Sequence, residues 1–354
     1  MSSYLSDRKQ YVYIDGTASD MRGVGVGVPQ GSCLGPLLFL IYVNDLPNST
    51  DLLDSILFAD DTSLFGAFST VSIDRNSDVV LINRELDKVH TWLNVNKLSL
   101  NVSKTKYMIF NNIRFDTTPH PTDSLKINGQ NIIKVSEFDF LGVVIDSEFN
   151  WTAHTTKVAG KISRTLGIMK KIKRFAPPEV MKILYQSLVL PHLHYGIRAW
   201  GTAHAKVATV QRKAIRIMAN TKMNSHTFPI FKENRLLTVE DIYKVSCLKM
   251  HYRIENSLAA PYFSTLRIIN WNVHDHNTRH RTIRYYNPNL KTHNDCFRYS
   301  LPKILDDLPD SLLGNIFSVS VTSFIKQIKI FFVQQYPLVC LKFPCQPCGR
   351  LPLI

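Results

Sequence analysis

The sequence predicts an α+β protein in which a strand-rich N-terminal part precedes a helical and strongly basic part. Up to about residue 148, short apolar segments alternate with turns that contain glycine, serine or aspartate, which is typical of strands and hairpins. From Trp151 onward, apolar residues recur every three to four positions, as in amphipathic helices. The charge changes at the same point, because residues 151–230 carry 14 Lys and Arg but one acidic residue, Glu179. We therefore predict three regions, at residues 1–148, 149–222 and 223–354.

The composition is that of a folded protein. The 354 residues are 45% hydrophobic and 20% charged, which excludes a disordered or collagen-like chain. The longest apolar segment, Leu34–Val43, is about half of the ~20 residues that a membrane-spanning helix needs. Six scattered cysteines favour a reducing compartment, so we expect an intracellular protein of the cytoplasm or nucleus with no membrane association. The net charge of +14 fits a polyanionic partner, but charge alone favours a merely solvated basic face. The motifs that precede the basic region favour the polyanionic partner.

Individual elements follow from apolar spacing and from turn residues. We expect a hairpin within residues 11–28, a buried helix over 34–45, a strand–turn–strand unit over 55–65 and short strands between 98 and 145. Expected helices cover 79–96, 155–175, 178–190, 202–220, 239–257 and 318–336, and the last third of the chain is less regular and mainly helical.

The segment Phe58-Ala59-Asp60-Asp61 carries two adjacent carboxylates between apolar strand arms. Such a pair at a hairpin tip can bind divalent cations, and a two-metal site activates an attacking hydroxyl and stabilises the leaving oxygen in phosphoryl transfer. Taken alone, an Asp-Asp turn is more often only a turn, because aspartate favours turn positions. The neighbouring motifs must therefore decide between the two interpretations.

A glycine-rich loop, Gly27-Val-Pro-Gln-Gly31, lies about 30 residues before the aspartate pair. Gly31 allows the backbone to approach a ligand closely, and the Gln30 amide offers both a donor and an acceptor. The alternative interpretation is a structural turn before a buried helix.

With these two motifs the sequence resembles the reverse transcriptase domain of non-LTR, LINE-type retrotransposons, particularly the jockey-like elements. The resemblance continues in order through WLNVNKLSLNVSKTKYMIF at 92–110, FLGV at 140–143 and ILYQSLVLPHLHYGIRAWG at 183–201. It implies a right-hand polymerase palm with most of the fingers missing in residues 1–148. A basic helical thumb in 149–222 and the C-terminal region of a retrotransposon protein in 223–354 would follow.

The resemblance also implies roles for individual residues. Asp60 and Asp61 would bind Mg²⁺ or Mn²⁺ as the catalytic carboxylates. Gln30, Gly31 and Lys104 would contact the nucleotide and template. Leu141 and Gly142 would form the primer grip. Backbone phosphates would be contacted by Lys157, Lys161, Arg164, Lys170, Lys171 and Lys173. The implied partners are an RNA template, a DNA primer and deoxynucleotides.

One departure from the family pattern concerns the metal site. The family takes a further metal-binding aspartate from a strand upstream of the Gly27–Gly31 loop, whereas the acids here are Asp7, Asp15 and Asp20 in unmatched contexts. We therefore expect an N-terminally truncated polymerase fragment whose nucleotidyl transfer is impaired. A non-catalytic nucleic-acid-binding remnant is the alternative, and an unstable product without a role is a third.

Two further motifs carry weaker signals. Cys345 and Cys348 form one CxxC pair without a second pair at zinc-finger spacing, so we interpret them as part of a loose tail. His192 and His194 have no carboxylate nearby in the sequence, and we interpret them as packing residues.

Overall fold

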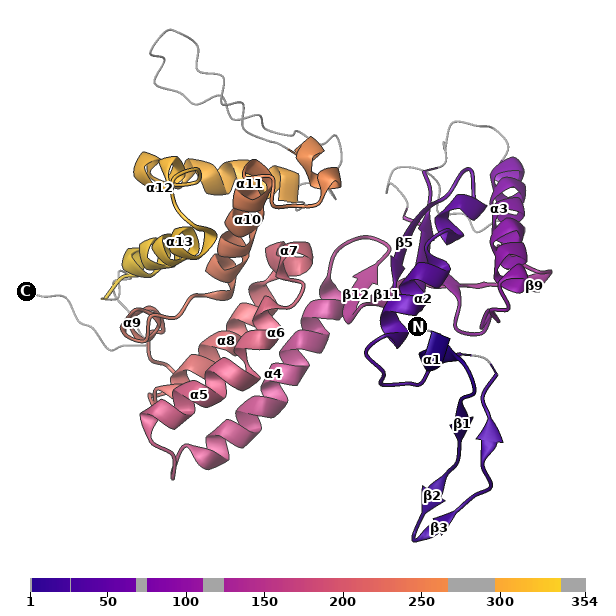
Figure 1. Cartoon of the computed structure of the whole chain (residues 1–354). Helices are drawn as coiled ribbons and strands as arrows, with labels where there is room; N and C mark the ends of the chain where they lie inside the picture. Colours follow the sequence, from indigo (N-terminus) through magenta and orange to yellow (C-terminus); the bar gives the residue numbers. More distant parts are fainter. Residues whose placement is uncertain (1, 26, 68–74, 111–123, 267–296, 339–354) are drawn as a thin grey trace, which may run out of the picture. The chain divides into compact units, whose positions relative to one another are not determined.

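The computed structural model describes residues 2–25, 27–67, 75–110, 124–266 and 297–338 of the chain (Figure 1). Their contacts divide into two compact units. Met1–Tyr107 and Asp116–Val135 belong to the first, which we call the strand-rich unit. Met108–Phe115 and Ser136–Ile354 belong to the second, which we call the helical unit. Among the described residues, no helix is long and apolar enough to cross a membrane.

The strand-rich unit consists of short strands arranged around two longer helices. Its elements are α1 (Ser2–Leu5), β1 (Lys9–Gln10), β2 (Tyr13–Ile14), β3 (Thr17–Ala18), β4 (Arg22–Gly23), α2 (Gly35–Val43), η1 (Leu46–Ser49), β5 (Asp54–Phe58), β6 (Asp61–Phe65), α3 (Arg75–Val95), β7 (Lys106–Tyr107), β8 (Lys126–Ile127), β9 (Gln130–Asn131) and β10 (Ile133–Lys134).

Every sheet in the described part of this unit has two strands. β2 and β3 pair around a turn at Asp15 and Gly16, both with positive φ, and β1 pairs with β4 further along the same ribbon. Asp-Gly favours this hairpin turn because both central positions need a left-handed backbone. The hairpin expected within residues 11–28 is confirmed, and its paired strands lie between Lys9 and Gly23.

Helix α3 holds the loop that leads into β5. The Glu85 side chain is buried, and its Oε2 accepts hydrogen bonds from the N–H groups of Asp51 at 2.7 Å and Leu52 at 3.2 Å. Its Oε1 pairs with Lys88 Nζ at 2.6 Å, and this hydrogen bond lowers the pKa of Glu85. The start of the β5–β6 hairpin is therefore tied to the middle of α3.

Helix α2 differs from the sequence expectation of a buried helix. Gly35 and Val43 are its buried residues, whereas Leu37, Leu40 and Ile41 are about half exposed or more. An apolar composition shows that a helix can be buried but not what covers it, and the described residues leave this surface open.

The helical unit begins with a hairpin and continues almost entirely as helices. Its elements are β11 (Glu137–Phe140), β12 (Val143–Asp146), α4 (Thr152–Ile172), α5 (Pro178–Leu188), α6 (Leu190–His194), α7 (Ile197–Trp200), η2 (Gly201–Ala203), α8 (Ala205–Met218), α9 (Phe228–Glu233), α10 (Val239–Glu255), η3 (Pro261–Leu266), α11 (Phe297–Asp306), α12 (Asp310–Gly314) and α13 (Val321–Gln335). The five helices expected after residue 150 are all present, and Pro178 and Pro191 each lie in the first turn of a helix, where proline is tolerated.

One continuous core holds this unit together. Helix α8 packs along α4, and α10 packs against α11 and α13 (Figure 1). Fully buried side chains at the centre include Ile162, Tyr185 and Trp200. The buried Gln211 amide donates to Tyr185 Oη and to the Leu237 carbonyl, both at 3.0 Å. Mixed α and β structure is thus confirmed, while the palm, thumb and C-terminal assignments stay predictions.

The Asp146 carboxylate joins the β11–β12 hairpin to α4. Its Oδ1 accepts hydrogen bonds from the N–H groups of Glu148 at 3.2 Å and Asn150 at 2.9 Å, and its Oδ2 accepts one from Trp151 at 2.8 Å. Phe149 and Trp151 both have positive φ, so the loop turns tightly around this carboxylate. Because Asp146 is 6% and Trp151 8% exposed, the Trp151 N–H has little access to water as a substitute partner.

We expect Asp146→Ala to lower the free energy of unfolding of the helical unit by about 3 kcal/mol, because it leaves the buried N–H of Trp151 and two partly buried N–H groups without their acceptor. Urea unfolding, followed by hydrogen-exchange mass spectrometry of α4 peptides, measures this change. The matched control is Glu148→Ala, two residues away and exposed, which should change stability by less than about 0.5 kcal/mol. Equal effects of the two substitutions would contradict the anchoring role.

Candidate functional site

The β5–β6 hairpin presents Asp60 and Asp61 at its tip. Phe58 pairs with Asp61, so Ala59 and Asp60 form a two-residue turn. Ala59 has a φ of 52°, a left-handed conformation that costs a non-glycine residue about 1–2 kcal/mol. Both aspartates are exposed to solvent. The predicted strand–turn–strand unit is confirmed.

The chemistry of the tip is that of an open oxygen-donor site. Mg²⁺ in proteins is typically bound through one or two carboxylates together with waters and substrate phosphates, and two adjacent exposed carboxylates fit that requirement. No group of three or more His, Cys, Asp or Glu side chains that could hold a metal ion occurs in the described ranges. The tip therefore offers two carboxylates that could bind a cation, and other donors would have to fill the remaining coordination positions.

The Gln30–Gly31 loop is open in the same unit. Gly31 has a φ of 87°, and no atom lies within 4 Å of the position that a Cβ would take. Glycine is therefore favoured here by the backbone conformation and not by a steric clash that a side chain would cause. Ser32 Oγ accepts a hydrogen bond from the Gly35 N–H at 3.1 Å and one from the Tyr4 hydroxyl. Gln30 and Gly31 themselves are exposed.

Lys104 lies on a tight turn closed by Asn101. The Lys104 N–H donates to the Asn101 carbonyl at 3.1 Å, and the Ser103 hydroxyl donates to Asn101 Oδ1 at 2.7 Å. Residues 98–101, where a strand was expected, form no strand, and β7 begins two residues after Lys104, at Lys106. Asp60, Asp61, Gln30 and Lys104 all belong to the strand-rich unit, whereas Leu141, Gly142 and the predicted phosphate-contacting cations belong to the helical unit.

Leu141 and Gly142 form the two-residue tip of the β11–β12 hairpin, between the paired Phe140 and Val143. Both have positive φ, 48° and 84°, which is strained for leucine. The Tyr195 hydroxyl donates a hydrogen bond to the Leu141 carbonyl, and the Tyr195 ring lies where a Cβ on Gly142 would come within 3.3 Å. Tyr195 therefore supports the backbone of this tip.

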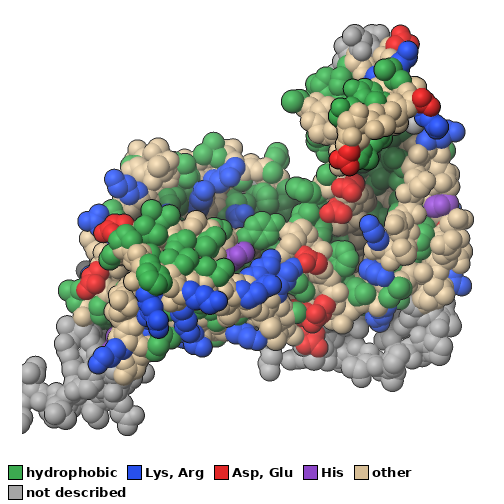
Figure 2. All heavy atoms as spheres, turned by 90° about the horizontal axis from the view of Figure 1, so that it is seen from below, with side chains coloured by type: hydrophobic (Ala, Val, Ile, Leu, Met, Phe, Trp, Pro, Cys, Tyr) green, Lys and Arg blue, Asp and Glu red, His purple; other side chains and the backbone are tan. Residues whose placement is uncertain are grey.

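Four cations of α4 fall on one stripe of the helix. The spacing of Lys157, Lys161, Arg164 and Lys171 returns to the same side at each turn. Lys170 and Lys173 fall outside this stripe. Figure 2 shows Lys and Arg side chains gathered on one face of the helical unit. Neither Lys161 nor Arg164 has an ion pair with another described residue, so both are available to a polyanion.

Two contacts join this stripe to the hairpin. Lys157 Nζ pairs with the Asp139 carboxylate on β11, and His154 Nδ1 accepts a hydrogen bond from the Val144 N–H at 3.1 Å. Burial lowers the pKa of His154 to about 4, with a further contribution from the charge on Lys157. Sequence reasoning missed Asp139, His154 and Tyr195, because each acts on a partner 10 to 54 positions away and no local motif marks it.

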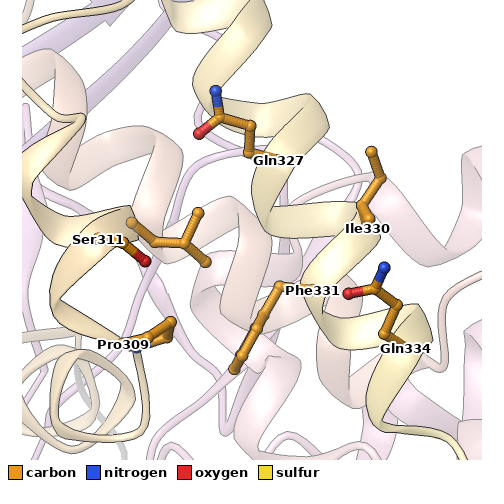
Figure 3. Close-up of a pocket in the computed structure, with 7 residues that line it drawn as sticks. Pro309, Ser311, Gln327, Ile330, Phe331 and Gln334 are labelled. Carbon is orange, nitrogen blue, oxygen red and sulfur yellow. The ribbon is translucent and has the colours of Figure 1, made fainter.

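A hollow in the helical unit is lined by uncharged residues. It has a volume of about 300 Å³ and lies between α12 and α13 (Figure 3). Its walls are apolar residues, a serine and two glutamines, namely Pro309, Ser311, Leu312, Gln327, Ile330, Phe331 and Gln334. Its lining contains no charged side chain and no base that could activate the Ser311 hydroxyl, so it offers no catalytic chemistry. Cys345 and Cys348 lie outside the described residues.

Residues 2–145 match the family described as reverse transcriptase (RNA-dependent DNA polymerase). These residues form a reverse transcriptase domain. The match includes the β5–β6 hairpin and ends on β12, so it covers both the aspartate pair and the Leu141–Gly142 tip. The family resemblance inferred from the motifs is thereby confirmed.

Similarity to known proteins extends beyond the reverse transcriptase domain. The chain is 24% identical over 278 residues to an RNA-directed DNA polymerase from mobile element jockey of Drosophila melanogaster. It is 26% identical over 277 residues to the protein of the same name from Drosophila funebris. Each alignment covers 73% of this chain and 29% of the relative. A probable RNA-directed DNA polymerase from transposon X-element of Drosophila melanogaster is 24% identical, with 72% and 28% covered.

The chain therefore spans under a third of the length of these curated relatives. Because the alignments are longer than the 2–145 match, they include part of the helical unit as well. No solved structure matches the chain.

We expect the free energy of unfolding of the helical unit to fall as the pH is lowered from about 6.5 to about 4. The pKa of His154 is about 4 in the folded chain and 6.5 for an unperturbed histidine, so the unfolded state binds more protons in this window. His154→Asn, whose amide oxygen can still accept from Val144, should show a shallower fall. Urea unfolding at a series of pH values tests this. Identical slopes for the two proteins between pH 4 and 6.5 would contradict it.

Proposed function

We propose that this chain is the catalytic-hairpin and primer-holding part of an RNA-directed DNA polymerase of a non-LTR retrotransposon. Its reaction joins a primer 3′-hydroxyl to the α-phosphorus of an incoming deoxynucleotide opposite an RNA template, and pyrophosphate leaves. The single observation that carries the proposal is the reverse transcriptase match over residues 2–145, which includes the exposed Asp60–Asp61 tip. Residues 1–148 would then be a partial palm, 149–222 a thumb, and 223–354 the C-terminal region of the element's protein.

Asp60 and Asp61 are the proposed ligands for Mg²⁺ or Mn²⁺. When bound, the divalent cation would lower the pKa of the attacking hydroxyl and neutralise charge on the leaving oxygen. The chain's own contribution is to hold both carboxylates on a short, tightly paired hairpin, which Glu85 ties to α3 through the loop before β5. Gln30, Gly31 and Lys104 are the proposed contacts for nucleotide and template.

The helical unit is the proposed holder of the primer–template duplex. Lys161 and Arg164 can neutralise successive backbone phosphates without reading the sequence. Lys171 extends this stripe towards the end of α4, and Lys157 contributes while it remains paired with Asp139. Lys170 and Lys173 are proposed phosphate contacts on another side of the helix end. Leu141 and Gly142 are the proposed primer grip, because their strained backbone is held in place by Tyr195.

The same observations favour a second candidate function, a nucleic-acid-binding protein without polymerase activity. We infer that catalysis by residues 1–354 alone is impaired, since the tip offers two carboxylates where the family uses three. Asp15, which lies upstream of the Gly27–Gly31 loop, is at the turn of a separate ribbon and does not join an acidic cluster within the described residues.

We expect purified chain to extend a DNA primer on an RNA template slowly with Mg²⁺ or Mn²⁺, and Asp60→Asn to reduce extension by about two orders of magnitude. The binding of the primer–template should not change, because Asp60 lies in the other unit from the cationic stripe. The matched control is Asp54→Asn, an exposed aspartate at the opposite end of the same hairpin, which should leave extension unchanged.

Mn²⁺ binding, measured by electron paramagnetic resonance with a deoxynucleotide present, gives a readout that does not depend on turnover. Asp60→Asn should weaken it and Asp54→Asn should not. Extension that is unaffected by Asp60→Asn would contradict the polymerase assignment. Tight duplex binding without extension by any variant would instead establish the non-catalytic function.

A further inference from the structure

A small cavity lies beside the Leu141–Gly142 tip, between the hairpin, α4 and α6. Its volume is about 150 Å³. Six of the residues that line it are Gly142, His154, Lys157, Lys161, His192 and Tyr195. Five of these six carry a hydrogen-bond donor in the side chain, and no acidic residue is among the lining residues. A cavity lined in this way is suited to an anion.

One of the lining residues, His154, carries a buried donor without a partner. His154 is 2% exposed, and its Nε2 has no hydrogen-bond partner in the described structure. Its Nδ1 accepts a hydrogen bond from the Val144 N–H, so Nδ1 carries no proton and the neutral ring must carry its proton on Nε2. A buried N–H without an acceptor is destabilising, and a ligand oxygen would remove that cost.

The charged side chains around His154 favour an anion over a cation as the ligand. Lys161 is exposed and has no ion pair with a described residue, while Lys157 is paired with Asp139. Burial lowers the pKa of His192, and the charge on Lys161 lowers it further, so Lys161 disfavours a second positive charge at this imidazole. Sequence reasoning interpreted His192 as a packing residue, whereas the structure places it at this cavity.

We propose that this cavity binds a single phosphate group of the nucleic-acid backbone, with His154 Nε2–H and Lys161 as its main donors. The assignment rests on the proposed function for the source of the phosphate, because it places that group next to the proposed primer grip. His192 and Tyr195 line the remaining walls, and the hydroxyl of Tyr195 is already used by the Leu141 carbonyl.

The donor of His154 distinguishes this cavity from the exposed lysines of the stripe. A lysine contributes charge, so its loss reduces the salt dependence of binding, whereas a neutral imidazole contributes a hydrogen bond that salt does not screen. Loss of the lysine should therefore change the salt dependence of binding, whereas loss of the imidazole donor should change the affinity alone.

The first test uses inorganic phosphate as the probe and the full chain labelled with ¹⁵N. Histidine side-chain spectra should show His154 as the Nε2–H tautomer, and phosphate should shift this resonance saturably. Lys161→Gln should weaken the affinity for phosphate about tenfold. Lys213→Gln on α8, exposed and away from the cavity, should not. No shift at His154, or a shift that Lys161→Gln leaves unchanged, would overturn the proposal.

The second test uses two substitutions of one residue and an RNA–DNA duplex. In His154→Asn, the amide oxygen can accept a hydrogen bond from the Val144 N–H, but no donor replaces the Nε2–H group. In His154→Gln, the longer side chain can place an amide N–H at the position of Nε2. His154→Asn should weaken duplex binding several-fold without changing the slope against salt, and His154→Gln should bind more tightly than His154→Asn. Lys161→Gln should reduce that slope by about one.

The outcomes separate this proposal from the proposed function. If phosphate shifts His154 but the chain binds no duplex, the cavity is an anion site and the proposed function fails. If the duplex binds and His154→Asn binds it as tightly as the parent chain, the proposed function stands and the assignment of the cavity to a backbone phosphate is wrong.

Discussion

Three hydrogen bonds to the Asp146 carboxylate connect the end of β12 to the start of α4, and the functional part of the helical unit depends on that junction. Through it, the Leu141–Gly142 tip and the cationic stripe of α4 become parts of one body. The His154–Val144 hydrogen bond and the Lys157–Asp139 pair connect the same two elements further along. A nucleic-acid strand that contacts the stripe would therefore meet the tip at a fixed offset, which positioning of a primer end requires.

The two hairpins with proposed roles use a common construction. Each has a two-residue turn with a non-glycine residue in the left-handed region, Ala59 in one and Leu141 in the other. Such strain persists only where the surrounding structure holds it. At Leu141 the support is the Tyr195 hydroxyl, whereas the Ala59 turn is closed by the pairing of β5 with β6.

Features set by local sequence could be predicted, and features set by distant contacts could not. The Ala59–Asp60 turn follows from two short apolar arms around polar residues, and α4 and α10 follow from apolar spacing. The order of four motifs was enough to predict the reverse transcriptase domain. In contrast, the support of Leu141 by Tyr195 spans 54 positions. The burial of α2 was expected from its apolar residues alone, but half or more of Leu37 and Ile41 is exposed, because burial depends on a neighbour that the helix sequence does not specify.

A hydrogen-exchange footprint of the full chain, with and without an RNA–DNA duplex, tests most directly whether the β11–β12 hairpin and α4 hold the duplex together. We expect slower exchange at the Leu141–Val144 tip and in the Lys157–Arg164 segment of α4 within the same complex, and loss of both effects at high salt. Protection of α4 with no change at the tip would contradict the claim that the hairpin and the basic helix hold the duplex together.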